Sequence, residues 1–282
     1  ADNVDGILVR IAQNYEAKLE LDKAITYWRK LLDRDRQRQG EYANAAQYNV
    51  AFLEIGRGNS RAAAKGFEEY YRYFGEADDA EATYFKAGAE WEQVSTNDAV
   101  NFYRRYLGKF PNENPDHVME AKYRIAKLYE KQGKTSAARR QMDEVVKQFD
   151  AYASSGVTMQ LRSRRMAAER DFEHLTAEFE TYRTGKMTRN EDKDVKLLET
   201  KDAELVEFDK KALAFIQKYN DFEYGLGAFY YMASAQLFVA ELGLTMDCPT
   251  KYSEDDCEVW FELYDEQYVP QFEGYQDKAI TR

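Results

Sequence analysis

The sequence predicts an all-α fold, built as an array of antiparallel helix pairs. Apolar residues recur every three or four positions over most of the chain, which is typical of amphipathic helices. A small residue recurs at intervals of about 36–39 residues, and the 282 residues include only 4 prolines. Low proline content favours long helices. We expect about a dozen helices and no sheet of more than two short strands.

The segment from Tyr123 to Val146 shows one such pair. Gly133 lies between two helical patterns, where a left-handed residue closes the last turn of a helix at little cost. Small residues at Ala126 and Ala138 let the two helices cross closely. The apolar faces consist of Tyr123, Ile125, Ala126 and Tyr129 before the glycine, and of Ala138, Met142 and Val145 after it.

Three further pairs precede this one. In each, an alanine opens the apolar face of the second helix, namely Ala24, Ala63 and Ala99. Aromatic residues follow at helical spacing, and Gly58 marks the turn of the second pair. The faces are formed by Leu8, Ile11, Ala12, Tyr15, Trp28 and Leu31, then by Val50, Ala51, Leu53, Phe67 and Tyr70, then by Tyr84, Ala87, Gly88, Trp91, Tyr103 and Tyr106.

These four units resemble the tetratricopeptide repeat, a helix pair of about 34 residues. Tyr129, Gly133 and Ala138 match the family pattern in register, and Tyr103 and Pro111 match it in the third unit. Longer connections such as "RDRQRQGEYA" and "PNENPDHV" would account for the wider spacing. The resemblance implies a right-handed superhelical solenoid, with four repeat-like pairs over residues 1–150.

Residues 151–282 predict longer, degenerate repeat-like pairs that end in an incomplete unit. Helices are expected over residues 159–182, 195–219, 229–243 and 258–272. We expect Gly225 and Gly227 to break the chain between helices and Gly243 to stop the third one. The final "GYQDKAITR" has the pattern of a helix start, so we infer that the native protein continues past Arg282 unless this end packs back on Trp260 and Tyr264.

The order of elements in this second half is similar to that in long repeat proteins of deltaproteobacterial cell envelopes, including gliding-motility and secretion machinery. This resemblance implies a periplasmic or envelope location. The first ten residues have no signal-peptide pattern; a signal peptide that has already been removed is the alternative. No run of eighteen apolar residues predicts a membrane span. The net charge of −11 disfavours nucleic acid and anionic lipid as partners.

The only two cysteines, Cys248 and Cys257, share one polar loop. We expect a disulfide bond between them, which would indicate an oxidising compartment; free thiols in a cytosolic protein are the alternative. The loop's "SEDD" lacks the glycine and closing glutamate of a calcium loop. His117 and His174 have no partner at metal-ligand spacing, and no catalytic or cofactor motif is present. We therefore expect no catalytic residue, metal or cofactor.

In tetratricopeptide arrays the first helix of each pair lines the concave face. The resemblance places eight residues there: Val9, Gln13, Tyr48, Phe52, Phe85, Ala89, Tyr123 and Lys127. Several family members hold a peptide carboxylate with Lys, Asn and Arg at these positions. Val9, Tyr48 and Phe85 stand there instead. An apolar groove of this kind suits an amphipathic helix or an extended apolar segment, although the same aromatics could pack between repeats.

Three functional interpretations follow. The first is a non-catalytic scaffold that binds other proteins through this groove in a bacterial envelope complex. The second is a helical-array enzyme that acts on peptidoglycan or another glycan through acidic groove residues, which would require two facing carboxylates with shifted pKa values. The third is self-association through the exposed C-terminal hairpin.

Overall fold

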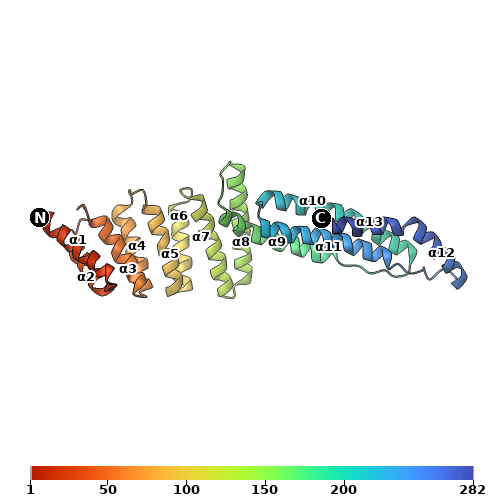
Figure 1. Cartoon of the computed structure of the whole chain (residues 1–282), viewed down its shortest axis with the longest axis horizontal. Helices are drawn as coiled ribbons and strands as arrows, with labels where there is room; N and C mark the ends of the chain where they lie inside the picture. The colour runs from red at the N-terminus through yellow and green to blue at the C-terminus, as the bar shows by residue number, and fades with distance from the viewer. Residues whose placement is uncertain (1, 282) are drawn as a thin grey trace. The chain divides into compact units, whose positions relative to one another are not determined.

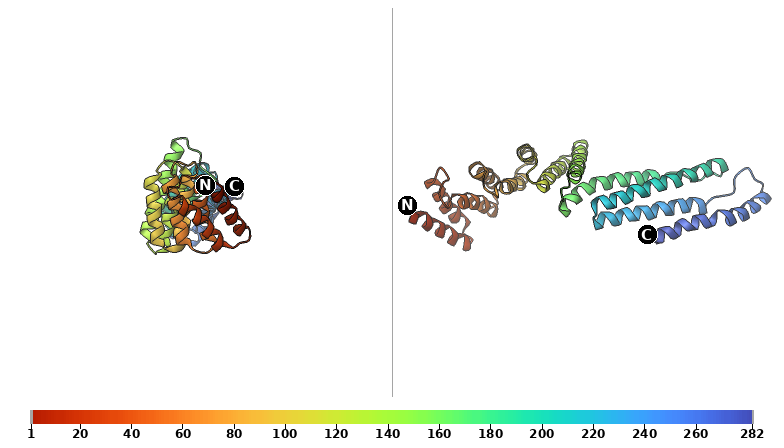
Figure 2. Two further views of the ribbon diagram at one scale, coloured as in Figure 1. Left: turned by 90° about the vertical axis from the view of Figure 1, so that its left-hand side faces the viewer. Right: turned by 90° about the horizontal axis from the view of Figure 1, so that it is seen from above.

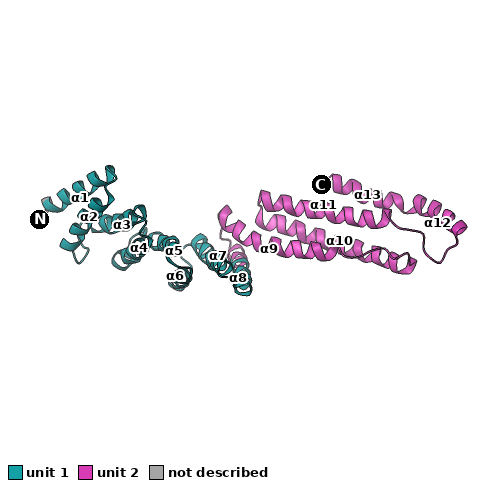
Figure 3. Cartoon of the chain, turned by 90° about the horizontal axis from the view of Figure 1, so that it is seen from below, with its two compact units in different colours: residues 1–148 teal, residues 149–282 magenta. Residues whose placement is uncertain are grey.

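The computed structural model describes residues 2–281 and contains 13 α-helices and no strands within that range (Figure 1). The all-α prediction is confirmed. The chain divides into two compact units, residues 1–148 and residues 149–282 (Figure 3). Each unit is described below by itself.

Unit 1 consists of short helices in antiparallel pairs. Each helix from α1 to α7 lies against its neighbours in the sequence, and Figure 3 shows the first helices of the pairs on one side and the second helices on the other. The helices are α1 (Asp2–Ala17), α2 (Leu21–Arg34), α3 (Ala43–Gly56), α4 (Ser60–Phe74), α5 (Ala80–Val94), α6 (Thr96–Lys109), α7 (Pro115–Lys131) and α8 (Thr135–Ser154), the last of which ends in unit 2.

The turns within the pairs follow local chemistry. Gly58 and Gly133 adopt φ angles of +73° and +71°, in the left-handed region that glycine enters at little cost. Asn59 then caps α4, because its side chain accepts a hydrogen bond from the backbone N–H of Ala62. The turn role predicted for both glycines is confirmed.

Small residues lie where helices cross. The four alanines that open the second helices are at most 1% exposed. Gly88 lies so close to Tyr103 that a Cβ atom there would be 2.5 Å from the ring. The core beside these crossings is rich in aromatic side chains, and its two indole N–H groups donate to carboxylates: Trp28 to Glu16, and Trp91 to Glu68 at 2.6 Å.

Unit 2 consists of longer helices. It contains α9 (Leu161–Tyr182), α10 (Glu191–Tyr219), α11 (Phe222–Leu244), α12 (Glu254–Gln267) and α13 (Val269–Ile280). The three long helices α9, α10 and α11 all lie against one another. The chain then turns back through α12, and α13 packs beside α11 (Figure 2).

The break predicted at Gly225 and Gly227 is wrong, because both glycines lie inside α11. The stop predicted at Gly243 agrees with the structure to within one residue, since α11 ends at Leu244. Gly227 and Gly243 also provide close contacts, since a Cβ atom would meet the rings of Phe172 and Phe272 at 2.6 and 2.3 Å.

The end of the chain also differs from the prediction. The helix expected over residues 258–272 is divided at Tyr268, where α12 ends and α13 begins with a proline in its first turn. Residues 274–280 therefore end α13 and do not start a new helix. Phe272 of this helix lies in a ring stack with Tyr264, at 6.5 Å between centroids.

Candidate functional site

The candidate binding surface is the first-helix face of unit 1, formed by α1, α3, α5 and α7. Among the eight predicted residues, Phe52 is 55% exposed, and Gln13 and Ala89 are also exposed. The other five are half-buried: Val9, Tyr48, Phe85, Tyr123 and Lys127. Val9 packs against the core of α1, α2 and α3. The face therefore presents apolar and aromatic surface that its own core does not cover.

Tyr48 joins α3 to α5. Its ring lies 6.2 Å from that of Phe52, nearly parallel to it, and its inner edge packs on Phe67. Lys86 of α5 donates a 2.8 Å hydrogen bond to the Tyr48 hydroxyl and lies 4.7 Å from the ring centroid. A cation beside an aromatic ring is attracted to its face. Phe52 and Tyr48 thus form a stacked aromatic pair on the surface, with the positive charge of Lys86 beside it.

Phe85 joins α5 to α7. Its ring stacks on the imidazole of His117 at 4.2 Å, and it also meets the ring of Tyr106 in a T-shaped contact at 4.9 Å. Nδ1 of His117 lies 2.8 Å from Glu81, which also accepts a hydrogen bond from the Tyr106 hydroxyl. The half-buried Phe85 is therefore held in place from both neighbouring helices.

Burial of the Glu81 carboxylate would raise its pKa, but hydrogen bonds from His117 and Tyr106 outweigh it and leave the pKa below its usual value of 4.5. A carboxyl group that serves as a general acid needs the opposite shift. Glu81 thus serves as a hydrogen-bond acceptor that connects Tyr106 of α6 and His117 of α7 to α5.

Arg124 links two other carboxylates of this face. It contacts Glu120 at 3.0 Å and Glu92 at 3.4 Å, and Glu92 accepts a 2.7 Å hydrogen bond from the Tyr103 hydroxyl. Burial first, and then that hydrogen bond, raise the pKa of Tyr103. Glu92 of α5 is therefore used in contacts with α6 and α7, while Glu120 pairs with Arg124 within α7.

Sequence reasoning missed three residues of this face, namely Glu81, Lys86 and His117. From the sequence, His117 is considered only as a metal ligand without partners, and it is the third residue of α7. Its separation from Phe85 and Glu81 is more than thirty positions, so no local pattern could reveal the contact. Lys86 follows Phe85 directly, and a lysine next to a face aromatic is the signal that could have indicated it.

Grooves also lie away from this face. One of about 400 Å³ in unit 1 is lined mainly by Arg104, Tyr129, Arg140, Glu144 and Lys147. One of about 620 Å³ in unit 2 lies between α9 and α10. Its floor holds Tyr182 and Phe208, and its rim carboxylates are each bonded to a lysine: Glu178 to Lys211, Glu204 to Lys201 and Glu207 to Lys210.

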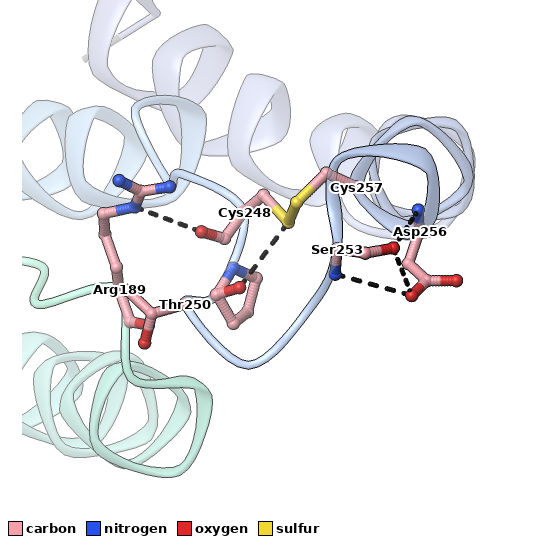
Figure 4. The surroundings of a disulfide bond; sticks show 7 residues. Arg189, Cys248, Thr250, Ser253, Asp256 and Cys257 are labelled. Atoms are coloured by element: carbon pink, nitrogen blue, oxygen red, sulfur yellow. Dashed lines mark hydrogen bonds between the residues drawn. A yellow bond between two sulfur atoms is a disulfide. The ribbon is translucent and has the colours of Figure 1, made fainter.

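The predicted pair Cys248 and Cys257 is bonded (Figure 4). The bond connects the loop after α11 to the first turn of α12. The loop is held from the other side by Arg189, whose Nε donates to the Cys248 carbonyl at 3.2 Å and whose own carbonyl accepts from the Thr250 N–H at 3.0 Å. Ser253 caps α12 in a reciprocal arrangement with Asp256. The disulfide therefore fixes where α12 begins.

Within residues 2–281, no group of three or more His, Cys, Asp and Glu side chains is arranged to hold a metal ion. In the same range, none of the helices combines the length and the apolar character needed to cross a bilayer.

Residues 120–151 match the sequence model of the tetratricopeptide repeat family. They comprise most of α7 and α8, around the turn at Gly133. No curated protein matches the chain.

Two solved structures are similar to the chain. One holds the TPR-like repeats assigned to a kinesin light chain of Podosopora anserina; it is 13% identical, covers 58% of this chain and 83% of its own, and gives a TM-score of 0.38. The other is a tetratricopeptide repeat protein from Parabacteroides merdae; it is 11% identical, covers 98% of both chains, and gives a TM-score of 0.39.

Proposed function

We propose that unit 1 is a scaffold module that binds an amphipathic helix or an extended apolar segment of another protein along its first-helix face. The observation that carries this proposal is Phe52, 55% exposed and stacked on Tyr48 beside Lys86. Exposed aromatic residues with a neighbouring cation are the side chains that dominate protein interfaces. The match of residues 120–151 to the tetratricopeptide repeat supports it, because this fold generally mediates protein–protein interaction.

The partner's chemistry follows from the face. A peptide carboxylate would need the polar clamp that Val9, Tyr48 and Phe85 replace. An apolar side chain can instead lie against Phe52, while an acidic group beside it can reach Lys86. We therefore expect a segment with large apolar residues at helical or alternating spacing and acidic residues on one flank.

We further propose an oxidising compartment, such as the periplasm of a bacterial envelope, as the place of action. The support is the bond between Cys248 and Cys257, because disulfides persist in such compartments and are rare in reducing ones. A thiol count on unreduced, unfolded protein isolated from its native host tests this. No reactive thiol is expected, and two reactive thiols would reject the proposed compartment.

The binding experiment uses a displayed library of amphipathic helical peptides selected on the immobilised chain, with affinities measured by fluorescence anisotropy. Phe52→Asp is expected to weaken selected peptides by at least about tenfold, since loss of an interface anchor costs about 2 kcal/mol or more. Tyr73→Asp is the matched control: Tyr73 is an aromatic residue of α4, 39% exposed, on the second helix of the same pair. Equal binding to both variants would reject the first-helix face as the site.

Nothing in the paired carboxylates Glu81, Glu92 and Glu120 favours the glycan-enzyme interpretation, and we do not propose it.

A further inference from the structure

The helix α11 exposes an uncharged apolar stripe in unit 2. Its side chains recur at helical spacing and face the same side of the helix. The exposed fractions are 85% for Phe222, 60% for Leu226, 66% for Tyr230 and 45% for Leu237; Phe229 at 38% and the half-buried Ala233 lie on the same side. We call these six residues the α11 stripe.

Neighbouring helices cover the other sides of α11. Gly227 and Tyr231 turn toward α9, where the Tyr231 ring lies 4.6 Å from Phe179 and 5.4 Å from Phe172. Gly243 turns toward α13, which lies beside the C-terminal part of α11 (Figure 1). α10 packs against α11 as well, and the stripe is on the side that these three helices leave exposed in unit 2.

We infer that the α11 stripe pairs with the same stripe of a second copy of this chain, in an antiparallel, two-fold symmetric dimer. A two-fold interface requires a surface that is complementary to itself, in which residue i meets j while j meets i. Leu226 and Leu237 lie equally far on either side of the peptide bond between Tyr231 and Met232. Tyr230 and Ala233 do as well. Antiparallel pairing about that point places leucine on leucine and each tyrosine ring over an alanine.

The spacing of the stripe fits this arrangement. Leu226, Tyr230, Ala233 and Leu237 are separated by four, three and four positions, the alternation that keeps a seam facing a partner helix. The small Ala233 provides the space that the Tyr230 ring of the other copy fills. A stripe of leucines alone would leave this register undefined.

Charge and area favour a second copy over other occupants. The six stripe residues carry no charge, so they add nothing to the repulsion between two copies of a chain with a net charge of −11; the same register brings Phe222 opposite the exposed Glu241 of the other copy. At 150–250 Å² for each large side chain, its exposed surface is on the order of 600 Å², so a pair would bury roughly 1,200 Å², the lower limit of stable interfaces. The helix has no Lys or Arg that would attract it to anionic lipid.

Sedimentation equilibrium of the full chain up to about 100 μM, a range in which weak interfaces are populated, tests this inference. The chain is expected to dimerise. Leu226→Glu and Leu237→Lys, each alone, should weaken dimerisation by at least about 30-fold, because each buries an unpaired charge. The double variant should recover most of the affinity, because each introduced carboxylate then faces the introduced ammonium group of the other copy. Val206→Glu on α10, where Val206 is 49% exposed, is the control and should change nothing.

Circular dichroism of each variant confirms that its helices are intact. A chain that stays monomeric overturns the inference, and binding of that monomer to lipid vesicles would assign the stripe to a membrane surface instead. A dimer that Val206→Glu weakens as strongly as Leu226→Glu also overturns it. A double variant weaker than either single one rejects the antiparallel register. None of these outcomes depends on the first-helix face of unit 1.

Discussion

Both units bury their apolar side chains between packed α-helices, but the helices of unit 1 are shorter than the three long helices of unit 2. Unit 1 uses helices of 14 to 17 residues from α1 to α7, each against its sequence neighbours, with alanines and glycines at the crossings. Unit 2 uses helices of 22, 29 and 23 residues that all contact one another. One ring of unit 2, Phe179, meets both Phe208 and Tyr231. A destabilising substitution should therefore affect only the neighbouring helices in unit 1, but all three long helices in unit 2.

The largest expected effect comes from removing one buried phenylalanine in each unit. Phe102→Ala and Phe179→Ala should each lower the free energy of unfolding by about 3–5 kcal/mol, because both rings are at most 2% exposed and leave a cavity. Amide hydrogen exchange should accelerate mainly in α5, α6 and α7 for Phe102→Ala. It should accelerate in α9, α10 and α11 together for Phe179→Ala. Equally wide acceleration in both variants would remove the contrast between the units.

The disulfide is expected to have the next largest effect. Replacing Cys248 and Cys257 by serine should cost about 2–3 kcal/mol, since the bond closes a loop of about ten residues in the unfolded chain. Urea unfolding, with exchange measured in parallel, checks this. Faster exchange is expected in α12 and α13, and the exchange of α1 to α6 serves as the internal control. An unchanged midpoint of unfolding would contradict the prediction.

Glycine substitutions compare close crossings with open positions. Gly88→Ala in unit 1 and Gly243→Ala in unit 2 should each destabilise by about 1–3 kcal/mol, because the new methyl group meets an aromatic ring. Gly108→Ala and Gly274→Ala, which are helical and have nothing within 4 Å, should stabilise by about 0.5–1 kcal/mol. Thermal unfolding distinguishes the two classes. If all four changes had the same sign, crossing distance would not be what matters.

The smallest effect concerns acid pH in unit 1. The folded-state pKa of Glu81 lies below its unfolded value, so its contribution is present above pH 4.5 and lost as the pH falls through the folded pKa. Glu81→Gln should cost at most about 1 kcal/mol at neutral pH, since the group is partly solvated. The difference from the native chain should shrink as the pH falls below 4.5. Glu113→Gln, in an exposed loop, is the matched control substitution.

Sequence reasoning succeeded where one residue has one local task. Gly58 and Gly133 were predicted as turns because only a left-handed residue closes such a helix cheaply. It failed at Gly227, which is the same residue type but faces Phe172 of another helix. A glycine that makes room for a distant ring carries no local signal. The prediction of one helix over residues 258–272 failed for a related reason. The apolar residues on both sides of Pro270 follow one helical spacing, although they belong to two helices, α12 and α13.

The same limit applies to the candidate sites. Helical register was enough to predict that Phe52 and Tyr48 share a face. The stacking of Phe85 on His117 depends on two helices meeting across more than thirty residues. The α11 stripe could not be predicted from the sequence, because a helix with apolar residues on nearly all sides is expected to be fully buried. Only the placement of the neighbouring helices α9, α10 and α13 shows which side of α11 stays exposed.

The three tryptophans described above lie in different places, with an optical consequence. Trp28 and Trp91 belong to unit 1 and lie buried with their indole N–H groups bonded to carboxylates. Trp260 belongs to unit 2, is less buried, and stacks on Tyr264 at 4.8 Å. The emission of a chain with phenylalanine at positions 28 and 91 would come from Trp260 alone. The fluorescence of this single indole would then report the unfolding of α12 and α13. The difference between the native spectrum and the spectrum of the variant would report the unfolding of unit 1, without any added label.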